Sequence, residues 1–283
     1  MTGSERGWAL ISVLWVLSIL TMLIAAAQAL SFSAAQREQR ALRDAESGAM
    51  LDAAIVRAVL GIEDPRPQLR WRVDGVPQTF AFRGQTIRVT IQDEFGRIDL
   101  NAADGSLINQ LLRSAGVEKQ AAEALTDNIL DWRSSSQEFR RWHGATNDDY
   151  AKAGLATRPR HNAFQSVDEL RLVYGMTPAL FASIRPAVTV YSRHPAIDTN
   201  TAPREALLAY YPNQRERVDE LLKTRATSAE RGGGNVGTLS DGFAGRTFDV
   251  TVAWTADRRA QRREAIVMLT NAPERPFLTM ALY

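Results

Sequence analysis

WALISVLWVLSILTMLIAAAQAL, residues 8–30, decides the fold, because it contains only four polar residues and no charged one. A helix of about 20 apolar residues crosses the hydrocarbon core of a bilayer, so this stretch predicts a membrane-spanning helix. Arg6 precedes the stretch, and the next basic residue is Arg37. Because basic flanks stay on the cytoplasmic side, we expect the short N-terminal end in the cytoplasm and the bulk of the chain exported.

The apolar stretch continues into an amphipathic segment with few helix breakers. No proline occurs before Pro65, and Gly48 is the only glycine within residues 8–60. We therefore expect one helix over 8–60, about 80 Å long. Small residues four apart allow another element to approach closely, and two interpretations of them stay open: packing on the protein's own body or on a neighbouring subunit. These residues are Ala41, Ala45, Ala49 and Ala53.

Composition limits the classes of function. The chain has 283 residues, 45% of them hydrophobic, which suffices for one or two domains with real cores. A net charge of only +2 makes nucleic acid an unlikely partner. The absence of cysteine excludes disulfides, thiolate metal sites and cysteine nucleophiles.

Alternating strand patterns follow the long helix. Residues 69–92 contain three short alternating runs, and Asp74-Gly75 and Arg83-Gly84 between them are hairpin signals, so we expect a three-stranded antiparallel meander. Residues 99–187 contain only helix and loop patterns. Strand patterns return at 187–191, 247–254, 264–269 and 277–283. The pattern predicts an α+β fold in which a mostly helical domain is inserted into an antiparallel sheet that the long helix covers.

The segment IDLNAA, residues 98–103, has a partial echo in IDTNTA, residues 197–202. Each precedes a helical pattern, and Asn is a favoured N-cap residue. We expect Asn101 and Asn200 to cap the helices that follow.

The N-terminus, MTGSERGWALISVLWVL, resembles a prepilin-type leader. The resemblance implies that a prepilin peptidase cleaves between Gly7 and Trp8 and that the new N-terminus is methylated. An ordinary signal anchor and a secretory signal cleaved after the A-x-A site at 27–29 remain alternatives. Most pilin-like subunits carry glutamate at the fifth mature position, which here is Ser12. The resemblance implies a subunit with no other subunit ahead of it.

Five segments in order make the resemblance specific. They are DEFGRIDLN (93–101), ILDWR (129–133), HNAFQSVDELRLVYGMT (161–177), AVTVYS (187–192) and DTNTAP (198–203). Together with the leader they resemble the general secretion pathway protein K family, the K-type minor pseudopilins of type II secretion, over residues 7 to about 211.

This resemblance implies a pilin-like fold and a non-enzymatic role at the tip of a periplasmic pseudopilus, helping to start its assembly. The implied partners are minor pseudopilins I and J, the major pseudopilin filament, the prepilin peptidase, the inner membrane and, in addition, secreted substrates. The expected organisation is a leader (1–7), the long helix (8–60), the first part of a pilin-like sheet (61–98), an inserted helical domain (99–187) and the second part of the sheet (188–283).

The loop between Arg133 and Asn162 is too long for a simple connector. The family is associated with calcium in this region, and calcium takes six to eight oxygen ligands. The candidate ligands are Asp131, Asp148 and Asp149. Serines at 134–136 and a threonine at 146 stand where the family has acidic residues, so a calcium site and a solvated polar loop both remain open.

Enzymatic patterns are weak. The three histidines are scattered without metal-ligand spacing, RGGGNVGT at 231–238 lacks the lysine of a phosphate loop, and no G-x-S-x-G occurs. The alternative function is a membrane-anchored DNA-binding protein, because the turns at 114–117 and 174–176 resemble helix-hairpin-helix modules. Such modules hold phosphates with backbone N–H groups. Here each turn has a single glycine and partly acidic flanks.

Overall fold

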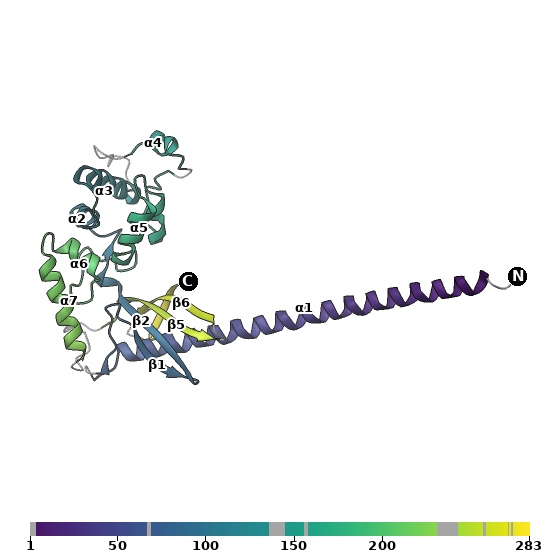
Figure 1. The fold of residues 1–283 in the computed structure, drawn as a ribbon. Helices are drawn as coiled ribbons and strands as arrows, with labels where there is room; N and C mark the ends of the chain where they lie inside the picture. The colour runs from purple at the N-terminus through teal and green to yellow at the C-terminus, as the bar shows by residue number, and fades with distance from the viewer. Residues whose placement is uncertain are drawn as a thin grey trace. The chain divides into compact units, whose positions relative to one another are not determined.

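The computed structural model describes residues 4–66, 69–135, 145–155, 158–230, 243–256, 259–270, 272 and 274–283. The chain divides into two units, Met1–Ala53 and Ala54–Tyr283. The first unit is helical throughout its described part, and the second holds every strand (Figure 1).

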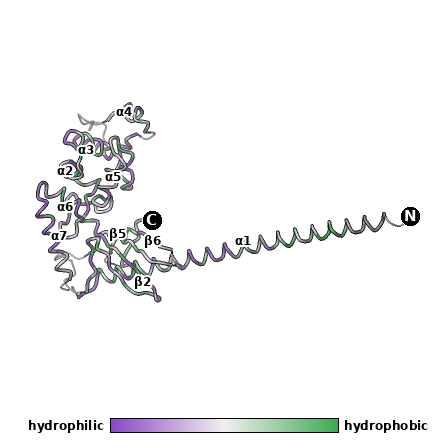
Figure 2. Tube along the Cα trace, viewed as in Figure 1, coloured by the Kyte–Doolittle hydropathy of each residue, from purple (hydrophilic) through white to green (hydrophobic). Residues whose placement is uncertain are grey.

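The long helix expected over residues 8–60 is present as α1, Ser4–Ile62, with no interruption in its 59 residues. Figure 2 shows a hydrophobic N-terminal part of α1 followed by a hydrophilic stretch. Among the described residues, no helical window combines the length and apolarity required to cross a bilayer. The last turns of α1 are apolar on one side and belong to the second unit, where Ala54, Ile55, Ala58 and Val59 are buried.

A five-stranded antiparallel sheet has the order β1-β2-β5-β6-β7. Its strands are β1 (Gln78–Phe82), β2 (Gln85–Asp93), β5 (Thr247–Ala256), β6 (Arg259–Leu269) and β7 (Phe277–Leu282). The predicted hairpin between β1 and β2 is confirmed. Its turn residues Arg83 and Gly84 have φ of 48° and 75°, the backbone that a two-residue hairpin requires.

The predicted strand at 69–73 is wrong: only an isolated bridge between Asp74 and Gln92 joins this segment to the sheet. The segment is held by the end of α1 instead. The Trp71 N–H donates to the Gly61 carbonyl at 2.8 Å, and a Cβ on Gly61 would lie 2.5 Å from the Trp71 ring. Only glycine permits this approach, and the alternating pattern of the segment therefore reflects packing on a helix.

The helical region lies between two neighbouring strands. β2 pairs with β5 from Arg88↔Ala253 to Asp93↔Phe248, and the chain between them forms a separate helical body (Figure 1). Its helices are α2 (Gly105–Ser114), α3 (Lys119–Arg133), α4 (Asn147–Lys152), α5 (Pro178–Ile184), α6 (Arg204–Tyr210) and α7 (Arg215–Glu230), with 3-10 turns η2 (Glu94–Gly96), η4 (Val167–Leu172) and η5 (Arg185–Ala187).

The strand expected at 187–191 is reduced to β4 (Val188–Thr189) and pairs in parallel with β3 (Ile98–Asp99), outside the main sheet. The helical body has its own apolar core, which begins at Ile98 and includes Trp132, Phe181, Leu207 and Val218. Leu207 and Val218 lie beyond the expected inserted domain (99–187) and still pack in this core.

The predicted asparagine caps are wrong. Asp104 caps α2 and accepts a hydrogen bond from the Leu107 N–H at 2.7 Å. Asn101 instead exchanges two hydrogen bonds with the Phe164 backbone, at 3.0 and 2.8 Å. Pro203 occupies the N-cap position of α6 without a side-chain hydrogen bond. The aspartate in each echoed segment forms the turn instead. The Asp99 carboxylate accepts a hydrogen bond from the Asn101 N–H, and the Asp198 carboxylate accepts one from the Asn200 N–H.

Candidate functional site

The N-terminal part of α1 exposes large apolar side chains. Trp8 is 76% exposed, Trp15 67%, Met22 76% and Phe32 72%. A continuous apolar surface of this kind marks a site for contact with lipid or with another protein.

The sequence-predicted residues of α1 lie on this helix. Gly7 is within its first turns, and Trp8 is exposed. Of the four small residues, Ala41, Ala45 and Ala49 are exposed and Ala53 is half-buried. Three of these four small side chains are therefore open to a partner.

A group of charged residues joins the sheet to the helical body, and we name it the junction network: Asp93, Glu94, Arg97, Asp198, Arg246 and Asp249. Its centre is Arg246, which forms ion pairs with Asp93 and, at 2.9 Å, with Asp198. The guanidinium also lies 4.7 Å from the centre of the Phe95 ring. Burial raises the pKa of Asp93, whereas the charge of Arg246 acts to lower it. Arg246 thus neutralises a fully buried carboxylate.

Arg97 forms the second half of the junction network. It pairs with Glu94 at 2.7 Å and with Asp249 at 3.0 Å. Burial raises the pKa of Glu94 to about 7, against the opposing charge of Arg97. The network therefore connects the end of β2, the segment before β3 and the start of β5.

Gly96, two residues before the first echoed segment, allows the backbone there to touch the end of the second echoed segment. A Cβ at this position would lie 2.7 Å from the Ala202 nitrogen and 2.7 Å from the Thr201 carbonyl carbon. Real Cβ atoms do not approach backbone so closely, so only glycine fits. This is the physical reason for glycine between Phe95 and Arg97.

The segment ILDWR holds the helical body together. Trp132 is fully buried, donates from its indole nitrogen to Glu169 at 3.2 Å, and stacks with Phe164 at 6.1 Å between ring centres. Arg133 donates to the carbonyls of Leu100 and Ala103, at 2.6 and 2.7 Å. The motif residues Trp132 and Arg133 therefore have structural roles.

The predicted calcium ligands lie on two elements. Asp131 is buried near the end of α3, and Asp148 and Asp149 are in the first turn of α4. The Asp149 carboxylate accepts from the N–H and hydroxyl of Thr146, at 2.8 and 2.7 Å, and so completes a capping box. No group of three or more Asp, Glu or His side chains in the described part of the chain is arranged to hold a metal ion. Residues 136–144 of the loop lie outside the described residues.

The two turns that suggested DNA binding line one hollow between α3 and α5. Gly116 and Gly175 have φ of 92° and 88°, as helix-hairpin-helix turns require. The N–H groups of Gly116, Val117 and Met176 already donate to carbonyls of their own turns, at 3.0 to 3.1 Å. They are not available to hold a phosphate, and the lining of the hollow contains no lysine or arginine.

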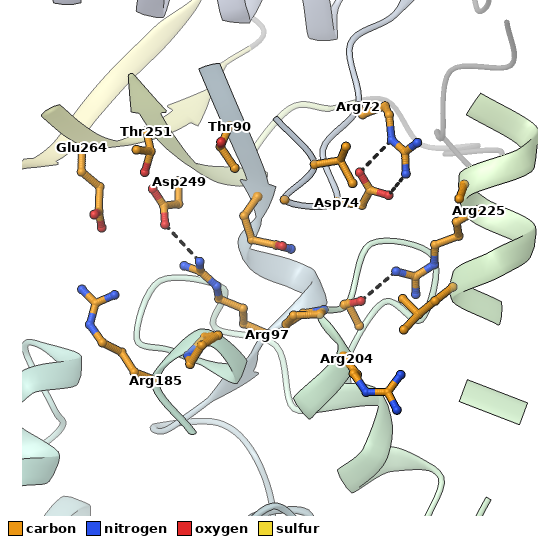
Figure 3. A pocket seen from close by; sticks show the side chains of 18 of the residues that line it. Arg72, Asp74, Thr90, Arg97, Arg185, Arg204, Arg225, Asp249, Thr251 and Glu264 are labelled. Atoms are coloured by element: carbon orange, nitrogen blue, oxygen red, sulfur yellow. Dashed lines mark hydrogen bonds and ion pairs between the residues drawn. The ribbon is translucent and has the colours of Figure 1, made fainter. Parts of the chain in front are cut away.

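A cavity of about 540 Å³ lies beside the junction network, where β2, β5 and β6 face η5, α6 and α7 (Figure 3). Both Arg97 and Asp249 line it. Sequence reasoning did not find the junction network or the cavity, because their residues are brought together from positions about 150 residues apart. The one available signal was DEFGR, which contains three members of the network.

Three comparisons with known proteins agree. The family model described as "Type II secretion system (T2SS), protein K" matches residues 92–193. Type II secretion system protein K of Klebsiella pneumoniae is 25% identical over an alignment of 255 residues, which covers 81% of this chain and 77% of that protein. A chain in the crystal structure of the GspK-GspI-GspJ complex from the enterotoxigenic Escherichia coli type 2 secretion system has a similar fold. Its TM-score is 0.60 at 16% identity, and the match covers 87% of this chain and 98% of that one.

Proposed function

We propose that this chain is a minor pseudopilin of the type II secretion system protein K family, which caps the tip of the pseudopilus and helps to start its assembly. The family model that matches residues 92–193 and the relative of 25% identity support this proposal. The observation that carries this role is the exposed apolar surface of α1 between Trp8 and Phe32. A filament subunit needs such a surface for lipid before assembly and for neighbouring helices afterwards. No catalytic activity is part of the proposal.

The N-terminal region would anchor the protein in the inner membrane, with the rest of the chain in the periplasm. The support is the uncharged stretch at 8–30 and its basic flanks. Cleavage by the prepilin peptidase between Gly7 and Trp8, followed by methylation of Trp8, would release the protein for assembly. The pilin-like part would be the end of α1 packed on the five-stranded sheet.

The partners would be minor pseudopilins I and J, because a chain of similar fold was solved in a complex with GspI and GspJ. Contact through α1 is supported by the exposed Ala41, Ala45 and Ala49, since small side chains let helices approach closely. Below this tip the major pseudopilin filament would continue. The helical body between β2 and β5 supports the tip position, because it would obstruct stacking along a filament shaft.

We retain calcium as a proposal for the loop after α3, with Asp131, Asp148 and Asp149 as candidate ligands. Ligand binding to the folded state raises its melting temperature. Calcium should therefore raise the melting temperature of the native chain but not that of an Asp148→Asn, Asp149→Asn double variant. An equal response of both proteins to calcium and to a chelator would remove this proposal.

The full-length protein tests the proposed function in cells that contain the secretion system. Mass spectrometry of the mature N-terminus should find methylated Trp8, and I and J should co-purify with the protein. A Gly7→Val variant should stay unprocessed and should abolish secretion, while the control Gly48→Val should be processed and should support secretion. Normal processing and normal secretion by the Gly7 variant would contradict the proposal.

A further inference from the structure

The cavity beside the junction network has the size of a ligand-binding site. Its volume of about 540 Å³ lies within the range of roughly 300–1,000 Å³ that is typical of sites for small ligands. Strands of the sheet form one side, and segments of the helical body form the other (Figure 3). Both sides belong to the second unit.

The lining is rich in positive charge. Six arginines face three carboxylates: Arg72, Arg97, Arg185, Arg204, Arg225 and Arg262 against Asp74, Asp249 and Glu264. Four of the six arginines are in ion pairs: Arg72 with Asp74, Arg97 with Asp249, Arg262 with Glu264, and Arg204 with Asp219 outside the lining. Among the described residues, Arg185 and Arg225 are the two that remain. An excess of arginine remains, and this favours an anionic ligand.

Arg225 is the most unusual member of the lining. It is only 7% exposed, and its guanidinium donates to the carbonyls of Ala202, at 2.7 Å, and Thr199. Among the described residues it forms no ion pair with a carboxylate. Burial accordingly lowers the pKa of Arg225. Asp74 and Asp198 attract its charge from a distance, but neither forms a direct ion pair with it. A buried charge is costly unless it is closely paired, so an anion in the cavity would stabilise this side chain.

Arg185 adds a second positive charge, which opposes the rise that burial causes in the pKa of the Glu264 carboxyl. Arg185 is exposed at the rim and has no ion pair in the described part of the chain. In Figure 3 its guanidinium is directed toward the side of the cavity where Asp249 and Glu264 lie. Arginine in such a position can bind a carboxylate through two parallel hydrogen bonds.

Two buried polar atoms in the lining lack hydrogen-bond partners among the described residues: the Nε of Arg97 and the Oδ1 of Asp249. Asp249 is 7% exposed. The first atom needs an acceptor and the second needs a donor. Buried polar atoms are nearly always paired in folded proteins, so the ligand should offer both groups.

We propose that this cavity binds a peptide segment through a carboxylate, whose charge compensates the arginines while its peptide C=O and N–H groups meet Arg97 and Asp249. An inorganic phosphate satisfies this pattern less well, because its greater negative charge would face Asp249 and Glu264. The carboxylate could belong to a chain end or to an acidic side chain. This inference does not depend on the proposed function, because it rests only on the lining of the cavity.

Fluorescence anisotropy of labelled peptides with the full-length protein in detergent micelles tests the proposal. The probes are a Gly-Ser pentapeptide with a free C-terminal carboxylate, the same peptide as an amide, and an amide with one internal glutamate. The free acid or the glutamate peptide should bind at least tenfold more tightly than the plain amide, and whichever binds identifies the source of the carboxylate.

Arg185→Gln should weaken this binding roughly tenfold, as expected for the loss of a charge-assisted hydrogen bond. Arg113→Gln is the matched control, because Arg113 is an exposed arginine outside the cavity, and it should bind like the native protein. Arg225→Lys, which keeps the charge but loses the planar fork, should bind more weakly than native. Equal binding of all three peptides, native affinity of the Arg185 variant, or equal competition by inorganic phosphate would overturn the proposal.

Discussion

Replacing Arg246 by methionine should destabilise the second unit more than any other single change in the junction network. The substitution keeps most of the apolar stem of the side chain but removes the charge that faces Asp93, whose side chain is 0% exposed. The carboxylate would keep only the Phe95 N–H at 3.0 Å and the Thr201 hydroxyl at 3.3 Å as donors. Breaking a buried ion pair on one side costs about 3–5 kcal/mol of folding free energy.

The loss should depend on pH in a defined direction. Burial raises the pKa of Asp93, and the charge of Arg246 opposes this rise. Without Arg246 the pKa of Asp93 in the folded state therefore rises further. The folded state then binds a proton more tightly than the unfolded state does, so the loss of stability grows as pH rises above the unfolded pKa. We expect a smaller defect at pH 5 than at pH 8.

Urea unfolding of the full-length protein in micelles, followed by tryptophan fluorescence, measures this effect. The double variant Asp93→Asn, Arg246→Met should recover at least about 2 kcal/mol relative to Arg246→Met alone, because it no longer buries an unpaired charge. The reasoning is refuted if Arg246→Met stays within about 1 kcal/mol of the native protein at pH 8, or if Asp93→Asn restores nothing.

Three further predictions concern other residues of the second unit. Gly96→Ala should cost about 1–3 kcal/mol of folding free energy, because its Cβ would meet the Ala202 backbone at 2.7 Å. The control variant Gly48→Ala has nothing within 4 Å of the added carbon, so it should leave the melting temperature unchanged or raise it. In the native protein the contribution of Glu94 to stability should fall as pH rises from 4.5 to about 7, because its pKa is raised in the folded state. Glu94→Gln should remove up to about 3 kcal/mol of that pH dependence in the same urea assay. Arg133→Met should lower the melting temperature by several degrees, because two carbonyls lose their charged donor; an unchanged melting temperature would contradict that role.

Local signals in the sequence predicted much of the fold. The absence of helix breakers predicted α1, the Arg83-Gly84 pair predicted the β1–β2 turn, and the pattern after Glu118 predicted α3. Each of these signals depends on residues a few positions apart, so no knowledge of the tertiary structure was needed. The last three strands were found for the same reason, since each is a short local run rich in β-branched, aromatic and other apolar residues.

Features that depend on distant residues were missed. The run at 69–73 alternates like a strand, but Trp71 packs on Gly61 and the segment does not join the sheet. Asn101 has the chemistry of a cap, yet the Phe164 backbone, 63 residues away, takes both its hydrogen bonds. The pairs of Arg246 with Asp93 and Asp198 leave no trace in local patterns.

The pairing of β2 with β5 means that two neighbouring strands of the sheet emerge at very different times during synthesis. About 150 residues separate the end of β2 at Asp93 from the start of β5 at Thr247. At a translation rate of about 5–20 residues per second, β2 waits about 8–30 s for its neighbour. During that interval the open edge of the β1–β2 hairpin can pair with other chains. The β1–β2 hairpin therefore stays open to such pairing until β5 arrives.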